Sequence, residues 1–232
     1  MTEVWVTDTD EIGAIPLPLF RLLDPGERAK ASSILSIQDR RLFIVGRILL
    51  RQALSVVLGG DPAVWSFTLG EHGKPCLAKQ LRSSHEAPRV DFNISHSGSA
   101  VAVSVSISDF RDCQVGLDIE LMDPTVFRGA EAPLDLFFTP EECDSLEKQS
   151  LDQRWEETLR LWTCKEAYAK FLGYGINLDF SKLKIPDANP DFAMETHELT
   201  LGKQKYHLAL ASRTDGVFRE SPVHRESLSL GI

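Results

Sequence analysis

The sequence predicts a fold that mixes helices and strands, of the α+β or α/β class, built as two small subdomains. Two periodicities predict this class. Several short segments alternate apolar and polar residues, and longer segments carry apolar residues three and four positions apart. Both halves of the chain contain both patterns, although no clear internal sequence repeat relates them. We place the boundary at the polar segment 109–112, which gives subdomains 1–109 and 110–232, with a loosely held polar tail after about residue 213.

The first half opens with a predicted strand at VWV. Asp24-Pro25-Gly26-Glu27 then predicts the start of a helix, with Asp24 as the N-cap residue and Glu27 completing a capping box. Apolar positions spaced by three and four predict a second helix over 39–58, which Gly59-Gly60 ends. The apolar positions form one buried face of this helix, and four arginines are expected away from that face: Arg40, Arg41, Arg47 and Arg51.

Three further strands are predicted in the first half and two in the second. The first three cover 65–69, 92–94 and 101–107, with a turn at 71–75, a polar loop at 80–88 and a tight loop at Ser95-His96-Ser97-Gly98. In the second half, strands are expected over 115–120 and 205–212. Between them we expect a loop to about Leu134, a helix from near Phe137, and a helix over 155–171 that Gly173 and Gly175 end.

Composition excludes several classes of protein. The chain has 232 residues, of which 43% are hydrophobic and 25% charged, as in ordinary globular proteins. It lacks an apolar run of about 20 residues and a signal-peptide pattern, so we expect a cytoplasmic protein without membrane association. The four cysteines are far apart, which argues against zinc and disulfides. A net charge of −9 argues against nucleic-acid binding but leaves room for a local basic pocket.

Two carboxylates stand two residues apart on the predicted strand 115–120. Asp118 and Glu120 therefore point to the same side, roughly 6.5 to 7 Å apart, while Val115, Leu117 and Ile119 face the core. Paired carboxylates repel each other unless a cation lies between them, and oxygen ligands of this kind suit Mg²⁺. The alternative is a solvated strand face, because a single DxE pattern is common.

A third carboxylate lies on the predicted helix 155–171. Glu166 and Lys170 are one helical turn apart and share a face. Glu166 could complete a metal site while Lys165 or Lys170 neutralises phosphate charge. The alternative is an ordinary surface ion pair, worth about 0.2 to 0.5 kcal/mol.

Five segments, taken in order, resemble the phosphopantetheinyl transferase superfamily. They are GKP at 73–75, FNISHSG at 92–98, VGLDIE at 115–120, FFTPEE at 137–142 and WTCKEAYAKFLGYGI at 162–176. The resemblance covers roughly residues 24–185. It is to the larger single-chain type that activates non-ribosomal peptide and polyketide synthases, with the KEA form of the last segment. It implies a pseudo-twofold pair of similar subdomains, with coenzyme A and a metal ion in the cleft between them.

The resemblance also implies roles for individual residues. Asp118, Glu120 and Glu166 resemble the ligands of Mg²⁺, or Mn²⁺, and Lys170 resembles the lysine that holds the phosphates, with Lys165 as a helper. The residues implied for the nucleotide end of coenzyme A are Gly73, Lys74, Pro75, Ser95 and His96. Outside this context, Lys74 and His96 would be interpreted as a solvated turn residue and a structural histidine. Lys30 and Arg41 resemble the residues near the 3′-phosphate, and Arg40 and Arg47 are alternatives.

Glu142 has two interpretations. In Thr139-Pro140-Glu141-Glu142 it is the third residue of a helix and completes a capping box. It also matches the family glutamate proposed as the general base. Both roles can hold together.

The implied reaction is transfer of the 4′-phosphopantetheine group of coenzyme A to a carrier-protein serine by a monomeric enzyme. Fatty-acid, polyketide and peptide carriers are all expected partners, docking on 122–146 with Phe127, Leu134 and Phe137, unless these aromatic residues belong to the core. One alternative function is a non-catalytic coenzyme A-binding scaffold or sensor, against which the complete carboxylate set argues. A second is a Mg²⁺-dependent phosphohydrolase.

Overall fold

The computed structural model confirms a mixed fold of helices and strands. It describes residues 1–70, 73–78, 89–108, 113–123, 133–174, 178–187, 189, 191–213 and 223–225. The predicted loop 80–88 and the predicted subdomain break 109–112 lie outside these residues. The described helices are α1 (Leu17–Phe20), α2 (Pro25–Ser33), α3 (Ile37–Leu58), α4 (Pro140–Glu147) and α5 (Leu151–Leu172). Short 3₁₀ turns cover Pro62–Val64, Leu134–Leu136 and Phe180–Lys182.

Within the described residues, the strands form three sheets. The first has the order β4-β5-β1-β9, made of Arg89–Ser97, Ala100–Ser108, Thr2–Asp8 and Val223–Arg225; β9 is parallel to β1 and the other pairs are antiparallel. The second is fully antiparallel, with the order β6-β8-β7, made of Val115–Leu121, Gln204–Arg213 and Phe192–Leu201. A small hairpin joins β2 (Phe67–Leu69) to β3 (Pro75–Leu77).

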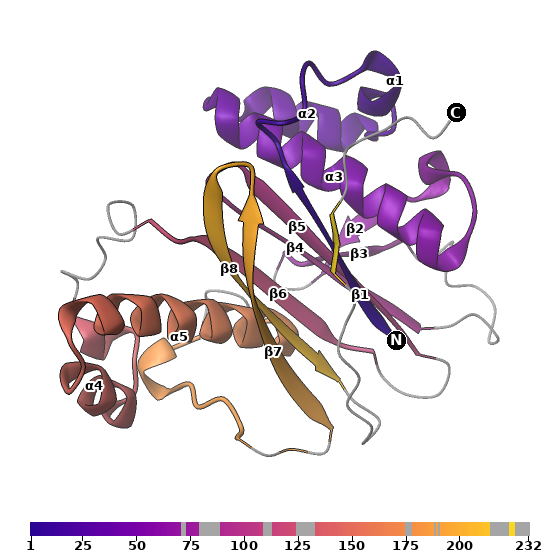
Figure 1. Cartoon of the computed structure of the whole chain (residues 1–232). Helices are drawn as coiled ribbons and strands as arrows, with labels where there is room; N and C mark the ends of the chain where they lie inside the picture. Colours follow the sequence, from indigo (N-terminus) through magenta and orange to yellow (C-terminus); the bar gives the residue numbers. More distant parts are fainter. Residues whose placement is uncertain are drawn as a thin grey trace.

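The two large sheets pack face to face between two long helices (Figure 1). The alternation of side chains along a strand explains this layering, because successive residues of β1 point to opposite faces of the sheet. Val4 and Val6 pack against the aliphatic side chains of β6 and β8, whereas Trp5 packs with α3 on the opposite face. Helix α5 covers the outer face of the second sheet, where Ala167 and Phe171 join a cluster with residues of β7 and β8. The protein is therefore layered as helix, sheet, sheet and helix.

Several predicted elements differ from the structure in their bounds. The segment Ser95-His96-Ser97 belongs to β4, and only residues 98 and 99 form the turn, where Gly98 has a φ of 56°. The helix expected from near Phe137 begins at Pro140, because residues 134–136 form a 3₁₀ turn first. Strands β3, β7 and β9 were not predicted. Arg51, which was expected away from the buried apolar face of α3, is itself fully buried.

The end of the chain is tied to its beginning. Residues 223–225 lie after the predicted loose tail begins, yet β9 pairs with β1 at Val4, Trp5 and Val6. The His224 ring stacks on Trp5 with 5.2 Å between ring centroids. This three-residue strand carries too little pattern to be recognised in the sequence, since its stability comes from the neighbouring strand.

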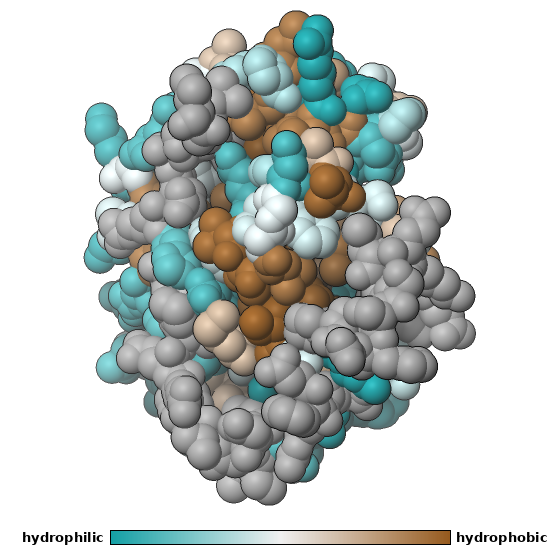
Figure 2. Space-filling view, turned by 90° about the vertical axis from the view of Figure 1, so that its right-hand side faces the viewer, coloured by the Kyte–Doolittle hydropathy of each residue, from teal (hydrophilic) through white to brown (hydrophobic). Residues whose placement is uncertain are grey.

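The surface mixes polar and apolar side chains, and one face carries apolar side chains at its centre with hydrophilic ones near them (Figure 2). In the described part of the chain, no helix is both long enough and apolar enough to cross a bilayer.

Gly116 allows α5 to lie unusually close to β6. A Cβ atom at this position would lie 2.0 Å from the Ala167 carbonyl oxygen and 2.3 Å from the Phe171 backbone nitrogen. Both are backbone atoms of the C-terminal turns of α5, so neither can move aside without distorting the helix. The absent side chain therefore sets the distance between the strand that carries Asp118 and the helix that carries Glu166 and Lys170.

Replacing Gly116 should consequently disrupt both stability and the site. We expect Gly116→Ala to lower the free energy of unfolding by about 3 kcal/mol or more, since the new methyl group collides with backbone. Urea denaturation measures this. The matched control is Gly13→Ala, where a Cβ meets no atom within 4 Å. Equal stability of the two variants would contradict the close-approach explanation.

Candidate functional site

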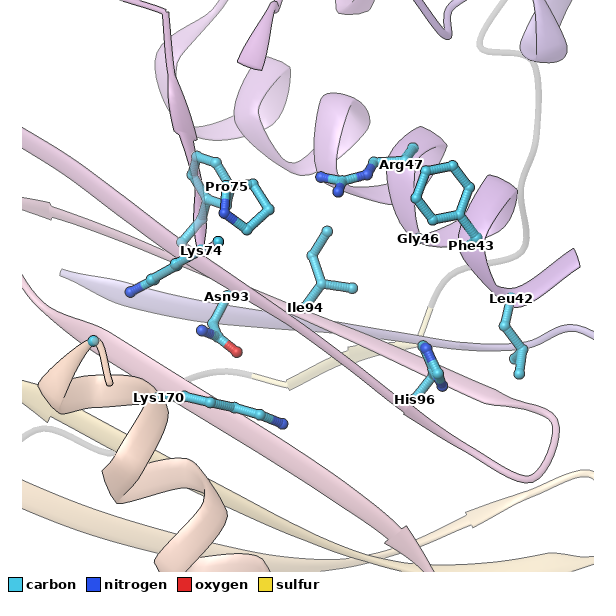
Figure 3. A pocket seen from close by; sticks show the side chains of 13 residues that line it. Leu42, Phe43, Gly46, Arg47, Lys74, Pro75, Asn93, Ile94, His96 and Lys170 are labelled. Carbon is cyan, nitrogen blue, oxygen red and sulfur yellow. The ribbon is translucent and has the colours of Figure 1, made fainter. Parts of the chain in front are cut away.

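A cavity of 350 Å³ lies between the helix α3, the strands β3 and β4, and the C-terminal end of α5. Its walls carry three cationic side chains and a histidine, contributed by four different elements and their loops. Arg47 extends from α3, Lys74 from the turn before β3, His96 from β4 and Lys170 from α5 (Figure 3). The other lining residues are Leu42, Phe43, Gly46, Gly73, Pro75, Phe92, Asn93, Ile94 and Gly173. Such a cavity suits an anionic ligand that also presents a flat or apolar part.

Asp118 does not line the cavity, but it is bonded to Lys170, which does. Asp118 is 3% exposed. Its Oδ1 atom accepts hydrogen bonds from the Lys170 ammonium at 2.6 Å and the Ser95 hydroxyl at 2.7 Å. Lys170 also donates to the Ser95 hydroxyl at 3.0 Å. These three side chains, from β6, α5 and β4, therefore join the two sheets and the second long helix.

Glu120 lies beyond Asp118 on the same side of β6. Its carboxylate accepts from the Ser97 hydroxyl at 2.7 Å and from the Trp162 indole nitrogen at 3.3 Å. Burial, followed by the charge of Asp118, raises the pKa of Glu120 to about 7. Burial also raises the pKa of Glu166, against the opposing effect of the Lys170 charge. The site thus gathers carboxyl groups whose ionised form is disfavoured by burial, and a bound cation would favour that ionised form.

Lys74 and His96 both line the cavity. The Lys74 ammonium forms an ion pair with Asp91 at 2.7 Å and donates to the Val115 carbonyl at 2.9 Å. Asp91 also accepts from the Val115 backbone nitrogen at 2.9 Å, so this pair ties the β3 turn to the start of β6. Burial and then Lys170 lower the pKa of His96, which favours the neutral ring.

Three predicted site residues lie elsewhere. Lys165 has no exposed surface; it forms an ion pair with Glu142 at 2.5 Å and donates to the Phe137 and Phe180 carbonyls. Arg41 donates to the backbone carbonyls of Thr9, Ile12 and Gly13.

Lys30 lies in the last turn of α2 and does not line the cavity. Of the two alternatives, Arg40 donates to the Ile34 carbonyl and Arg47 lines the cavity.

Glu142 occupies the capping-box position that its sequence context predicts. Its carboxylate accepts from the Thr139 backbone nitrogen at 2.8 Å, and its own backbone nitrogen donates to the Thr139 hydroxyl at 3.3 Å. The structure confirms the cap. The role as a general base stays a prediction.

Sequence reasoning missed Asn93 and Phe43. Both line the cavity, and the Asn93 Oδ1 atom is buried without a hydrogen-bond partner in the described residues. Asn93 lies two residues before Ser95 on β4, and this spacing is the one signal that could have marked it.

The pKa of Glu120 predicts how stability depends on pH. The unfolded pKa is near 4.5 and the folded pKa near 7, so the folded protein binds the proton more tightly. The contribution of this carboxyl to stability is full below pH 4.5 and is lost as pH rises through 7. We expect urea unfolding of the metal-free wild type to show an extra loss on the order of 1–3 kcal/mol between pH 5 and pH 8 compared with Glu120→Gln. Parallel curves for the two proteins would contradict the raised pKa.

Comparison with known proteins identifies the family. Residues 114–215 match the model of the 4′-phosphopantetheinyl transferase superfamily, and residues 16–108 match the model of the 4′-phosphopantetheinyl transferase N-terminal region. The 4′-phosphopantetheinyl transferase HetI of Nostoc sp. is 32% identical over 173 residues, which cover 75% of this chain and 69% of the relative. The 4′-phosphopantetheinyl transferase Sfp of Bacillus subtilis is 26% identical over 192 residues, covering 78% and 79%.

A solved holo-(acyl-carrier-protein) synthase from Bacillus anthracis, in complex with CoA (3′,5′-ADP), covers 44% of this chain and 96% of its own at 13% identity. Its TM-score of 0.34 is too low to bear on the fold. The two family models together cover both halves of the molecule, including every element that contributes to the cavity. This chain belongs to the 4′-phosphopantetheinyl transferase superfamily.

Proposed function

We propose that this protein transfers the 4′-phosphopantetheine group of coenzyme A to a serine hydroxyl of an apo carrier protein and releases adenosine 3′,5′-bisphosphate. One observation supports this most strongly. Lys170, which is bonded to the buried carboxylate of Asp118, lines a cavity whose remaining walls carry further cationic side chains. A pyrophosphate bound beside Lys170 would lie near both this ammonium group and the carboxylates that could hold a cation for it.

The carboxylates fit a hard divalent cation, Mg²⁺ or Mn²⁺. The Oδ2 atom of Asp118 is buried and has no hydrogen-bond partner among the described residues, so it retains the capacity to ligate. In the same residues no three His, Cys, Asp or Glu side chains are already arranged around a metal position, and Lys170 provides the compensating charge. We propose Asp118, Glu120 and Glu166 as the ligands. The bound ion would supply positive charge to the pyrophosphate oxygens.

The chemical step balances as a displacement at phosphorus. The carrier serine oxygen forms a bond to the β-phosphorus of coenzyme A, and the bond from that phosphorus to the bridging oxygen breaks. The bisphosphate leaves with the electron pair. We assign to Lys170, which lines the cavity and is bonded to Asp118, the neutralisation of charge on the phosphate oxygens, a main requirement of phosphoryl transfer. The hydroxyl proton passes to a base, for which we retain Glu142.

Fatty-acid, polyketide and non-ribosomal peptide carriers are the proposed partners, and we keep 122–146 as the docking segment. Leu136 is 59% exposed and available for contact. Phe138 is 3% exposed, and the Phe137 ring packs edge-on against Trp162 with 5.4 Å between centroids, so both contribute to the core. Phe127 lies outside the described residues. We further propose a cytoplasmic monomer, since both halves of the cavity come from one chain.

Removing a proposed metal ligand should abolish transfer without unfolding the protein. We expect Asp118→Ala and Glu166→Ala each to reduce turnover about a thousandfold or more, because several kcal/mol of charge stabilisation is lost. The measurement is intact mass spectrometry of apo carrier proteins incubated with coenzyme A and Mg²⁺, with EDTA as control. Asp179→Ala is the matched variant, since Asp179 pairs with Lys182 on the exposed surface outside the proposed docking segment.

Retained turnover in either ligand variant would contradict the metal-site assignment. If wild type binds coenzyme A but modifies none of several carrier types, the non-catalytic scaffold is favoured instead. Release of bisphosphate without any carrier would favour the phosphohydrolase.

Substituting Glu142 together with Lys165, its buried partner, separates the capping role of Glu142 from its proposed role as the base. Glu142→Gln keeps a capping side chain but leaves the Lys165 ammonium unpaired, and we expect a loss of about 3–5 kcal/mol in unfolding free energy. Glu142→Gln/Lys165→Met should recover stability by removing both charges. Turnover of the double variant should stay about a hundredfold low if Glu142 is the base. Wild-type turnover by the stable double variant would leave Glu142 with a structural role alone.

A further inference from the structure

A second cavity, of 680 Å³, lies between the first half of α5 and the strands β7 and β8. It shares no lining residue with the cavity that holds Lys170. Glu156 and Arg160 contribute to it from the helix, and Glu198 and His207 contribute from the strands. Its volume is that of a small-molecule site, which is usually about 300 to 1,000 Å³. The transfer reaction proposed above uses none of these four residues.

Carboxylates outnumber cations on the walls of this second cavity. Among the described residues that line it, Arg160 is the one Lys or Arg side chain. Two hydrogen bonds, at 2.7 Å and 2.6 Å, already connect the Arg160 guanidinium to the Glu157 carboxylate. Glu156 and Glu198 add two further carboxylates, so the walls carry a net negative charge. Such walls repel anions and attract cations.

His207 brings a buried acceptor to the second cavity. It is 6% exposed, and its Nδ1 atom has no hydrogen-bond partner among the described residues. It stands directly opposite Glu198 in the antiparallel β7–β8 pair, so both side chains point to the same face of the sheet. Burial, followed by the charge of Arg160, lowers the pKa of His207 and favours the neutral ring. In the tautomer protonated at Nε2, the Nδ1 atom accepts a hydrogen bond from a ligand's N–H group.

The arrangement of these groups favours an organic cation over a metal ion. In the part of the chain that the structure describes, no three His, Cys, Asp or Glu side chains are placed to hold a metal ion together. Glu156 and Glu198 come from different walls, the helix and the sheet. A guanidinium or ammonium group presents several N–H donors in different directions, so a molecule carrying two such groups reaches acceptors that do not converge on one point.

We propose that the second cavity binds a small organic cation of the alkylguanidinium or polyamine class. Glu156 and Glu198 pair with its charged groups, and the His207 Nδ1 atom accepts from one of its N–H groups. This binding goes beyond phosphopantetheine transfer and does not rest on it. A free amine and an arginine side chain of a partner polypeptide share this chemistry, and the experiment distinguishes them.

Calorimetric titration of the whole protein with agmatine, which carries one guanidinium and one ammonium group, tests the proposal. We expect saturable binding of one molecule per chain. Glu156→Gln and Glu198→Gln should each weaken binding about tenfold or more, the loss expected for one charge-assisted hydrogen bond. His207→Phe should weaken it in the same direction without changing the charge of the walls. Asp179→Asn is the matched control and should bind as the wild type does, because Asp179 is an exposed carboxylate outside the second cavity.

The absence of saturable binding by the wild type overturns the proposal. Equal weakening in Asp179→Asn and Glu198→Gln also overturns it, because attraction to the overall charge of the protein then explains the binding. Titrations with spermidine and with N-acetyl-arginine methylamide identify the source of the cation. Binding of agmatine and spermidine alone supports a free amine, and binding of the blocked arginine as well supports a polypeptide side chain. These titrations contain no coenzyme A and no carrier, so their failure is distinguishable from a failure of transfer.

Discussion

The contact between Gly116 and α5 is the constraint on which the site depends. Because glycine has no side chain, the backbone of β6 approaches the helix at Ala167 and Phe171. This short distance between β6 and α5 brings the carboxylates of the strand close to the Glu166 and Lys170 side chains of the helix. A longer separation would leave the Asp118–Lys170 bond unmade and the buried carboxylates without compensation.

The charge of the cavity is opposite in sign to the net charge of the whole protein. The protein is acidic overall, with a net charge of −9, yet the cavity gathers Arg47, Lys74 and Lys170. Each of these cations is held by a carboxylate on a neighbouring element, namely Glu27, Asp91 or Asp118. Such pairing keeps the cations in place before a ligand binds, so less ordering is needed when it does.

Structural and chemical roles share the same residues in two places. Glu27 and Glu142 each complete a capping box and each pair with a buried cation, Arg51 and Lys165 respectively. In both glutamates the oxygen that accepts from the N-cap backbone nitrogen, Oε2, also contacts the cation of the other helix, so one carboxylate serves the cap and the ion pair together. The two long helices α3 and α5 are each fixed in this way to the short helix that precedes them.

The sequence by itself determined the local elements: the capping boxes, the long helices, and the strand on which Asp118 and Glu120 share a side. These depend on neighbours along the chain, through helical and strand periodicity. Only the tertiary structure decided which cations meet the cavity, bringing Arg47 there and directing Arg41 and Lys165 to backbone carbonyls. It also decided the pairing of β9 with β1. The direction of a long cationic side chain depends on partners distant in sequence, which no local pattern encodes.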